Sequence, residues 1–310
     1  MDVSILGRIG YDLYAEEHGV PLRDVTRFSR YLGGSSANMA VGLSRLGARV
    51  GMISCVGADP LGDYLIEYLK KERVDTRFVQ RKPGLLSSLS LTEVSPPDRF
   101  PQVFYRERPA DTAVETGPEE RDFICATRLF VTNGTSLCAS PSREATFRAL
   151  EWAHREGVRV AFDVDYRASS WPNPATAGLY ARLALPWIDI LIANPDEILM
   201  VAESDDVAEA IVRLRRWGVP LVVAKMGAEG VRAETADEAV FQRAYPVEVV
   251  STIGAGDGFA SGFLYALLQE KPLATALAYG NAAAAIVCTR LMCSDAMPTL
   301  SEVEEFLAAR

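Results

Sequence analysis

Short apolar segments alternate with helical patterns through most of the 310-residue chain. The apolar character of these segments is continuous rather than alternating, so the strands they form are expected to be buried on both faces. Repeated strand–helix units are typical of a mostly parallel, doubly wound sheet flanked by helices, and we predict one such α/β domain over residues 1–310. The expected strands lie at 3–7, 49–57, 128–134, 158–164, 189–194 and 220–227, and the expected helices at 36–46, 60–72, 141–155, 174–183, 196–200 and 205–217.

Two segments, residues 11–34 and 85–111, interrupt this alternation. Both show partial two-residue periodicity and turn signals, His-Gly-Val-Pro in the first and Ser-Pro-Pro-Asp in the second. We therefore expect hairpin-like strands that form a small β lid outside the main sheet. Such a lid would stand over the carboxyl ends of the strands, where α/β folds bind their ligands.

The charge and composition of the chain exclude several classes of function. A net charge of −9 argues against a broad nucleic-acid surface, which requires clustered lysine and arginine. No apolar run reaches the ~18 residues needed to span a bilayer. The first residues, MDVSILGRIG, show no secretory signal, and the five scattered cysteines match no zinc spacing. We expect a cytoplasmic protein with free thiols.

The stretch Gly254-Ala255-Gly256-Asp257 places small residues and one carboxylate before an apolar helix. Glycines allow a ligand to approach the backbone closely, and free N–H groups at a helix N-terminus attract phosphate oxygens. An aspartate there could take a proton from an attacking hydroxyl during phosphoryl transfer. The same pattern also fits an aspartate that only caps its helix. The chain lacks the GxxxxGK[ST] motif of P-loop proteins.

Polar residues beside two other strand ends are candidates for binding a polyol. Gly33 and Gly34 precede an expected helix, and Asn38 in its first turn can donate and accept hydrogen bonds to hydroxyl groups. Taken alone, this stretch is better explained as a turn with a serine cap. Asp12 closely follows the first strand, where it could recognise a hydroxyl or belong to a surface turn.

Two further stretches carry charged or polar candidates. The second irregular segment contains Arg99, Arg106 and Arg108, and arginine binds carboxylates through two parallel hydrogen bonds. Arg106 is the best candidate to reach a bound acid, since the other two are more typical of a solvated strand face. Asn194 and Glu197 lie at a strand-to-helix junction, where Glu197 could organise water on a magnesium ion or simply complement the helix dipole.

Five stretches together resemble the PfkB family of carbohydrate kinases, also called ribokinase-like. Each stretch is weak by itself, but their order and spacing across the chain are specific. The resemblance implies a ribokinase-like fold and the phosphorylation of a sugar hydroxyl by ATP with Mg²⁺. The stretches are Gly33-Gly34 with Asn38, FDVDYR at 162–167, NPDE at 194–197, KMGAEG at 225–230 and GAGD at 254–257.

The resemblance also implies roles for individual residues. Asp257 would be the catalytic base, and the backbone of Gly254, Ala255 and Gly256 would form the anion hole for the transferring phosphoryl group. Glu197 would contact the magnesium ion through water. The implied sugar-binding set is Asp12, Gly33, Gly34, Asn38, Arg106 and Arg167, and the implied nucleotide- and phosphate-binding set is Asn194, Glu197, Lys225, Gly227, Gly230 and Asn281.

The resemblance further implies an ATP-dependent kinase that phosphorylates the terminal hydroxyl of a sugar acid. A lid arginine fits such a substrate, because simple sugars carry no carboxylate. The alternatives are a kinase of another acid such as 2-dehydro-3-deoxygluconate, a kinase of a neutral sugar such as fructose or ribose, and a binding protein without catalysis.

Two features of the family carry over less directly. Ser251 stands where the family has an aspartate associated with a monovalent-cation site, so the sequence leaves activation by potassium (K⁺) open. Leu291 and Met292 also depart from the family pattern, beside the expected adenine pocket. A homodimer through the exposed lid edge is a further expectation taken from the family, since unpaired strands invite partners.

Overall fold

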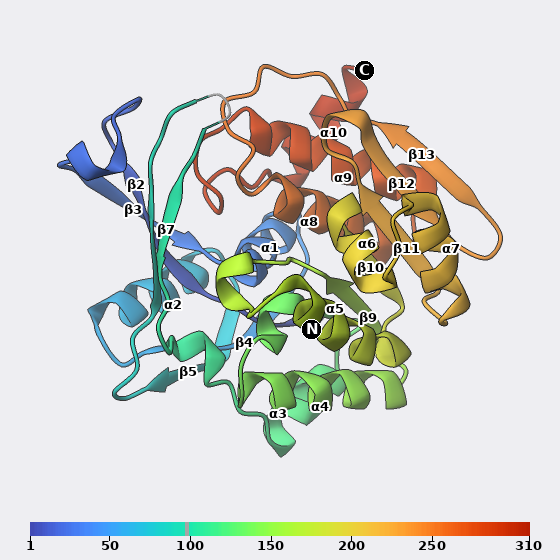
Figure 1. The fold of residues 1–310 in the computed structure, drawn as a ribbon, viewed down its shortest axis with the longest axis horizontal. Helices are drawn as coiled ribbons and strands as arrows, with labels where there is room; N and C mark the ends of the chain where they lie inside the picture. The colour runs from blue at the N-terminus through green and yellow to red at the C-terminus, as the bar shows by residue number, and fades with distance from the viewer. Residues whose placement is uncertain (97–98) are drawn as a thin grey trace.

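The structure is a computed structural model that describes residues 1–96 and 99–310. Pro97 and Asp98, which belong to the predicted Ser-Pro-Pro-Asp turn, lie outside the described residues. In the described part of the chain, helices pack on a nine-stranded sheet of order β13-β12-β11-β10-β9-β8-β1-β4-β5 (Figure 1). The strands from β11 to β5 in this order run parallel, so the predicted α/β fold is confirmed.

Every strand and helix expected from the sequence is present, with ends that differ by a few residues. The main sheet contains β1 (Val3–Leu6), β4 (Val50–Gly57), β5 (Asp75–Lys82), β8 (Leu129–Asn133), β9 (Arg159–Asp163), β10 (Ile190–Ala193), β11 (Leu221–Lys225), β12 (Gly230–Glu234) and β13 (Ala239–Arg243). The α-helices are α1 (Ser35–Arg45), α2 (Pro60–Lys71), α3 (Pro118–Cys125), α4 (Ser142–Arg155), α5 (Pro174–Ala184), α6 (Pro195–Ala202), α7 (Val207–Arg216), α8 (Ala255–Leu268), α9 (Leu273–Cys288) and α10 (Leu300–Ala308).

Each face of the sheet carries its own apolar core, because successive strand residues point to opposite faces. Ile5 and Val131 pack with residues of α1, α2, α8, α9 and α10, whereas Leu6 and Phe130 pack with residues of α3 to α7. The continuous apolar runs of the sequence therefore serve two cores at once. No helix in the described part of the chain combines the length and the hydropathy needed to cross a bilayer.

The main-sheet strands that the sequence did not reveal lie at the edges of the sheet. β5 pairs in parallel with β4 at one edge, and β12 and β13 form an antiparallel hairpin at the other. An edge strand has a neighbour on one side only and is partly solvated, so polar residues interrupt its apolar run. β5, with the sequence DTRFVQRK, shows this effect.

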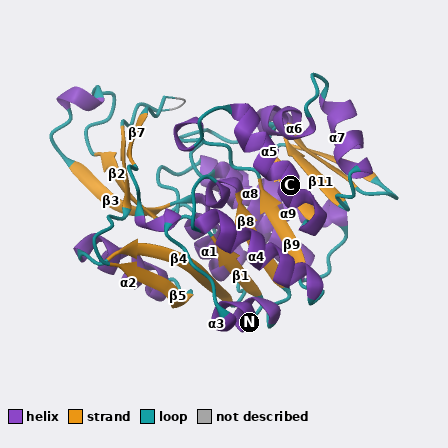
Figure 2. Ribbon diagram, turned by 60° about the horizontal axis from the view of Figure 1, so that its bottom comes forward, coloured by secondary structure: helices purple, strands orange, loops and turns teal. Residues whose placement is uncertain are grey.

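A second sheet of four strands stands apart from the main sheet, at the upper left of Figure 2. Its strands come from the two segments that interrupt the strand–helix alternation. β2 pairs antiparallel with β3 and parallel with β6, and β6 pairs antiparallel with β7. The chain passes from β1 directly into this sheet and returns to α1, so the second sheet is anchored at the carboxyl end of β1. Its strands are β2 (Gly10–Ala15), β3 (Phe28–Gly33), β6 (Ser88–Thr92) and β7 (Gln102–Tyr105).

Candidate active site

The N-terminus of α8 carries the carboxylate of Asp257 in its first turn. Gly254 caps the helix with a φ of 82°, a left-handed conformation that favours glycine. The helix begins at Ala255, so Asp257 lies within its first turn. The N–H of Ala255 donates to the carbonyl of Thr252 at 3.2 Å, whereas the N–H of Gly256 has no hydrogen-bond partner among the described residues. This free donor lies at the positive end of the helix dipole, where an anion is stabilised.

Two side chains of α1 hold the Asp257 carboxylate from the opposite side. The hydroxyl of Ser35 donates to Oδ1 at 2.7 Å, and the amide of Asn38 donates to Oδ2 at 2.7 Å. The amide is oriented in turn by Ser294, whose hydroxyl donates to Oδ1 of Asn38 at 2.6 Å. Asn38, expected to bind the sugar, thus positions the carboxylate in this structure, and neither Ser35 nor Ser294 was singled out from the sequence.

The environment of Asp257 raises its pKa to about 6. Burial is the main cause because it disfavours the charged form, and the nearby negative charge of Asp165 adds to it. The hydrogen bonds from Asn38 and Ser35 and the positive charge of Arg167 act in the opposite direction. A carboxylate with this pKa is ionised at neutral pH and can still accept a proton efficiently, as a general base requires.

Asp12 and the paired glycines form one compact cluster beside the start of α1. Asp12 lies on β2 and is buried, and its Oδ1 accepts a hydrogen bond from Ser90 at 2.7 Å. Only glycine fits at position 33, because a Cβ there would overlap the Asp12 carboxylate. Gly34 has a φ of 94°, and a Cβ there would lie 2.5 Å from the carbonyl oxygen of Arg8. Burial raises the pKa of Asp12, although the Ser90 bond and nearby cations oppose this.

Acidic residues at the end of β9 pair with basic residues that the resemblance indicated. Asp163 accepts a hydrogen bond from Nζ of Lys225 at 2.7 Å. Asp165 accepts from Nε of Arg167 at 2.9 Å and from Asn133 at 3.2 Å. Asp165 also has a φ of 37°, and backbone strain of this kind concentrates at functional sites. Neither aspartate was singled out from the sequence, although acids at the carboxyl end of a buried strand are a usable signal.

Asn194 and Glu197 form a capping box at the start of α6. The side chain of Asn194 accepts from the N–H of Glu197 at 2.9 Å, and Glu197 Oε2 accepts from the N–H of Asn194 at 2.8 Å. Oε1 of Glu197 accepts from the N–H of Tyr166 at 2.8 Å, which fastens the loop after β9. The Glu197 carboxylate is therefore fixed in place by the backbone on both oxygens.

A pocket of about 600 Å³ adjoins the N-terminus of α8. Its lining is mainly apolar and includes Thr252 from the loop before α8 and Ala255 and Gly256 from the first turn of the helix. The amide of Asn281 donates to the carbonyls of Gln242 and Arg243 at 3.2 and 3.0 Å, so it fixes β13 against α9 at the pocket wall. Four of the residues expected to border the nucleotide line this pocket: Lys225, Gly227, Gly230 and Asn281.

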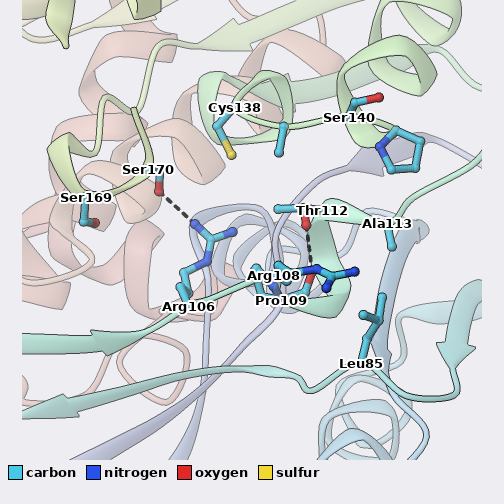
Figure 3. A pocket seen from close by; sticks show the side chains of 12 residues that line it. Leu85, Arg106, Arg108, Pro109, Thr112, Ala113, Cys138, Ser140, Ser169 and Ser170 are labelled. Atoms are coloured by element: carbon cyan, nitrogen blue, oxygen red, sulfur yellow. Dashed lines mark hydrogen bonds between the residues drawn. The ribbon is translucent and has the colours of Figure 1, made fainter. Parts of the chain in front are cut away.

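Arg106 follows β7 and lines a separate cavity of about 370 Å³. Its guanidinium forms a buried ion pair with Asp111 and donates to the hydroxyl of Ser170 at 2.9 Å. Figure 3 shows Arg106 directed towards Ser170, with Arg108 extending along the opposite side of the cavity. The charge of Arg106 is thus already balanced within the protein.

Phosphoryl transfer to an alcohol requires a base for the hydroxyl, donors for the developing negative charge and a site for the phosphate donor. The carboxyl edge of this sheet brings such groups together, as expected of a carbohydrate kinase. The chain belongs to the pfkB family of carbohydrate kinases, whose family model matches residues 2–300. It is a phosphotransferase that acts on a sugar hydroxyl.

Similar proteins extend over nearly the whole chain. The 5-dehydro-2-deoxygluconokinase of Geobacillus thermodenitrificans is 38% identical, with 99% of this chain and 93% of that protein covered. The protein of the same name from Bacillus subtilis is 35% identical, with 100% and 96% covered. Among solved structures, aminoimidazole riboside kinase from Salmonella enterica has a TM-score of 0.85 and 25% identity, and all of both chains is covered. The same enzyme has been solved with aminoimidazole riboside and an ATP analogue, and that complex covers 99% of this chain and 100% of its own, with a TM-score of 0.84 and 25% identity.

Proposed function

We propose that the protein transfers the γ-phosphoryl group of ATP to the terminal hydroxyl of 5-dehydro-2-deoxy-D-gluconate and so forms its 6-phosphate. The buried Asp257 carboxylate, held by Ser35 and Asn38 at the free N-terminus of α8, is the observation that carries the reaction type. The names of the full-length relatives at 35–38% identity support the choice of substrate.

In this proposal Asp257 accepts the proton of the attacking hydroxyl as its oxygen bonds to the γ-phosphorus of ATP. The bond from that phosphorus to the β–γ bridging oxygen breaks, and ADP leaves. The N–H of Gly256 and the dipole of α8 stabilise the negative charge on the phosphoryl oxygens. Asp12 and the backbone at Gly33 and Gly34 hold the sugar so that its terminal hydroxyl faces the carboxylate. Arg167 lies close enough to Asp257 for its positive charge to favour the ionised carboxylate, although its ion-pair partner Asp165 opposes this.

The pocket beside α8 suits the nucleotide, with its apolar wall against the adenine and Lys225 near the phosphates. A magnesium ion bound with ATP would neutralise phosphate charge. No group of three or more His, Cys, Asp or Glu side chains in the described residues could hold a metal ion alone. That fits an ion coordinated mainly by phosphates and water, which Glu197 would contact through a water molecule while Asn194 fixes the carboxylate.

The second sheet acts as a lid over the sugar in this proposal, within a single domain that spans the chain. Lid closure would exclude water, which competes with the sugar as phosphoryl acceptor.

β7 is an edge strand with exposed Val103 and Tyr105, so it offers a surface through which two copies could form a homodimer. We place the reaction in the cytoplasm, where ATP is available.

We also propose that the enzyme does not require potassium. Ser251 is buried, and its hydroxyl accepts a hydrogen bond from the N–H of Ile253 at 3.2 Å, so it closes the loop without supplying a negative charge. Replacing K⁺ by tetramethylammonium in the assay should therefore leave kcat unchanged. A steep loss of activity without K⁺ would show that other ligands hold the cation.

A panel of sugars and sugar acids tests the substrate, with ADP release as the readout. Selective turnover of 5-dehydro-2-deoxygluconate supports the proposal, and preference for 2-dehydro-3-deoxygluconate, fructose or ribose would replace it. Absence of ADP release with every compound would instead favour a binding protein.

In purified Asp257→Asn, ligand binding should persist while turnover falls by ~10²–10⁴-fold, the usual contribution of a general base. Near-normal turnover would remove Asp257 from this role.

A further inference from the structure

Arg8 is a buried arginine without a side-chain partner in the described part of the chain. It follows β1 by two residues, at the carboxyl end of a central strand, and only 8% of its surface is exposed. Its guanidinium forms no hydrogen bond and no ion pair with any described residue, and its Nε is completely buried. A buried charge without a counterion is strongly unfavourable, so such groups are normally paired or bind a ligand.

The surroundings of Arg8 increase its need for an anion. Burial lowers its pKa, and the nearby positive charges of Arg106 and Arg167 lower it further, against the weaker opposing influence of Asp165 and Asp12. Of these carboxylates, Asp165 is already ion-paired with Arg167. Arg106 is likewise ion-paired with Asp111, so Arg8 alone of these three arginines has no ion-pair partner among the described residues.

Arg8 also lies next to the backbone that would hold the sugar. Its carbonyl oxygen accepts a hydrogen bond from the N–H of Ala37 at 3.3 Å. The same carbonyl packs against Gly34, where a Cβ would be too close to it. Ser35, the next residue, donates to Asp257. The unpaired guanidinium and the catalytic carboxylate are thus connected through one short piece of backbone at the start of α1.

We propose that Arg8 binds the carboxylate of the sugar acid and is the residue that selects acids over neutral sugars. The proposal rests on the function proposed above and specifies which side chain recognises the carboxylate of the substrate. Arg106 is less suited to this role, because Asp111 and Ser170 already bind its two terminal nitrogens and only its buried Nε has no partner among the described residues. Arg8 binds one end of the substrate while Asp257 deprotonates the hydroxyl at the other end.

Arg8→Met tests this role, because methionine keeps much of the side-chain length without the charge. Its KM for 5-dehydro-2-deoxygluconate should rise by about 10- to 100-fold, the range for loss of hydrogen bonds to a charged group. Its kcat/KM for the neutral ketose D-fructose, measured in parallel, should stay at the wild-type level. Arg8→Lys should give an intermediate KM, since it keeps the charge but loses the planar fork.

Thermal melting separates substrate binding from a structural role. Unliganded Arg8→Met should melt no lower than the wild type, because an unpaired buried charge is removed. The keto acid should raise the melting temperature of the wild type and not that of the variant. As a matched comparison, Arg106→Met should melt lower even without substrate, because it leaves Asp111 buried and unpaired.

The outcomes distinguish this inference from the proposed function. If the wild type phosphorylates the keto acid and Arg8→Met keeps its KM, the Arg8 assignment is wrong and the function stands. A lower melting temperature of unliganded Arg8→Met, or equal losses with acid and fructose, would also overturn it. If the wild type prefers another sugar acid, the substrate proposal fails and Arg8 is tested on that acid. A wild type that accepts only neutral sugars overturns both.

Discussion

Ser35→Ala should move the acid limb of the pH–rate profile to higher pH. The pKa of Asp257 is raised to about 6 by burial and by the charge of Asp165, while the hydrogen bonds from Asn38 and Ser35 partly oppose this rise. The Ser35 bond is short, at 2.7 Å, and it stabilises the ionised carboxylate more than the protonated form. Without this donor the carboxylate holds its proton more tightly, so the base is inactivated at a higher pH.

The size of the shift follows from the strength of the lost bond. A hydrogen bond to a charged group contributes about 1.5–3 kcal/mol. One pKa unit corresponds to about 1.4 kcal/mol, so complete loss would raise the pKa by about one to two units. A water molecule that replaces the hydroxyl would restore part of the stabilisation, so we expect the acid limb to shift by about one pH unit.

The assay is kcat/KM for the sugar substrate as a function of pH, because this ratio reports ionisation of the free enzyme. Ser261→Ala is the matched control, since its hydroxyl donates at 2.8 Å to the carbonyl of Asp257 rather than to the carboxylate. Its acid limb should coincide with that of the wild type. If the acid limb of Ser35→Ala also coincides with that of the wild type, then this limb does not report the ionisation of an Asp257 carboxylate hydrogen-bonded by Ser35.

Two further predictions concern the nucleotide side and the packing of the C-terminal helices. Asp163→Asn should raise the KM for ATP by about tenfold, in the range for hydrogen bonds to charged groups, because Lys225 loses its ion-pair partner. A KM for the sugar that rises equally would contradict this assignment. Gly262→Ala should lower the stability by about 1–3 kcal/mol, the usual cost of overpacking, since its Cβ would lie 2.5 Å from the carbonyl oxygen of Tyr279. A melting temperature equal to that of the wild type would show that α8 and α9 can separate at this point.

Much of the fold could be predicted because it depends on local patterns. The buried strands β1, β8 and β10 have continuous apolar runs, and turn residues separate them from the helices. The edge strand β5 could not be recognised, since its charged residues reflect a position in the sheet that only pairing reveals. The same holds for β13, which alternates between partly buried and exposed residues.

The candidate site was predictable only in part. The GAGD stretch indicated Asp257 because a small-residue loop, an acid and an apolar helix are adjacent in sequence. Asp163 and Asp165 were overlooked, since their ion pairs with Lys225 and Arg167 depend on the loop after β9. The capping box of Glu197, by contrast, depends only on residues that are adjacent in the sequence, the NPDE stretch.

The sequence by itself determined the α/β architecture, the order of the motifs and the position of Asp257 at the start of its helix. Only the tertiary structure decided what surrounds that carboxylate, because Ser35 and Asn38 lie 222 and 219 residues away along the chain. It also decided which arginine is available to a substrate. Arg106 is neutralised by Asp111, whereas Arg8 is buried and has no partner within residues 1–96 and 99–310. Sequence patterns record local geometry, but the pKa and the pairing of a charge depend on residues that only folding brings into contact.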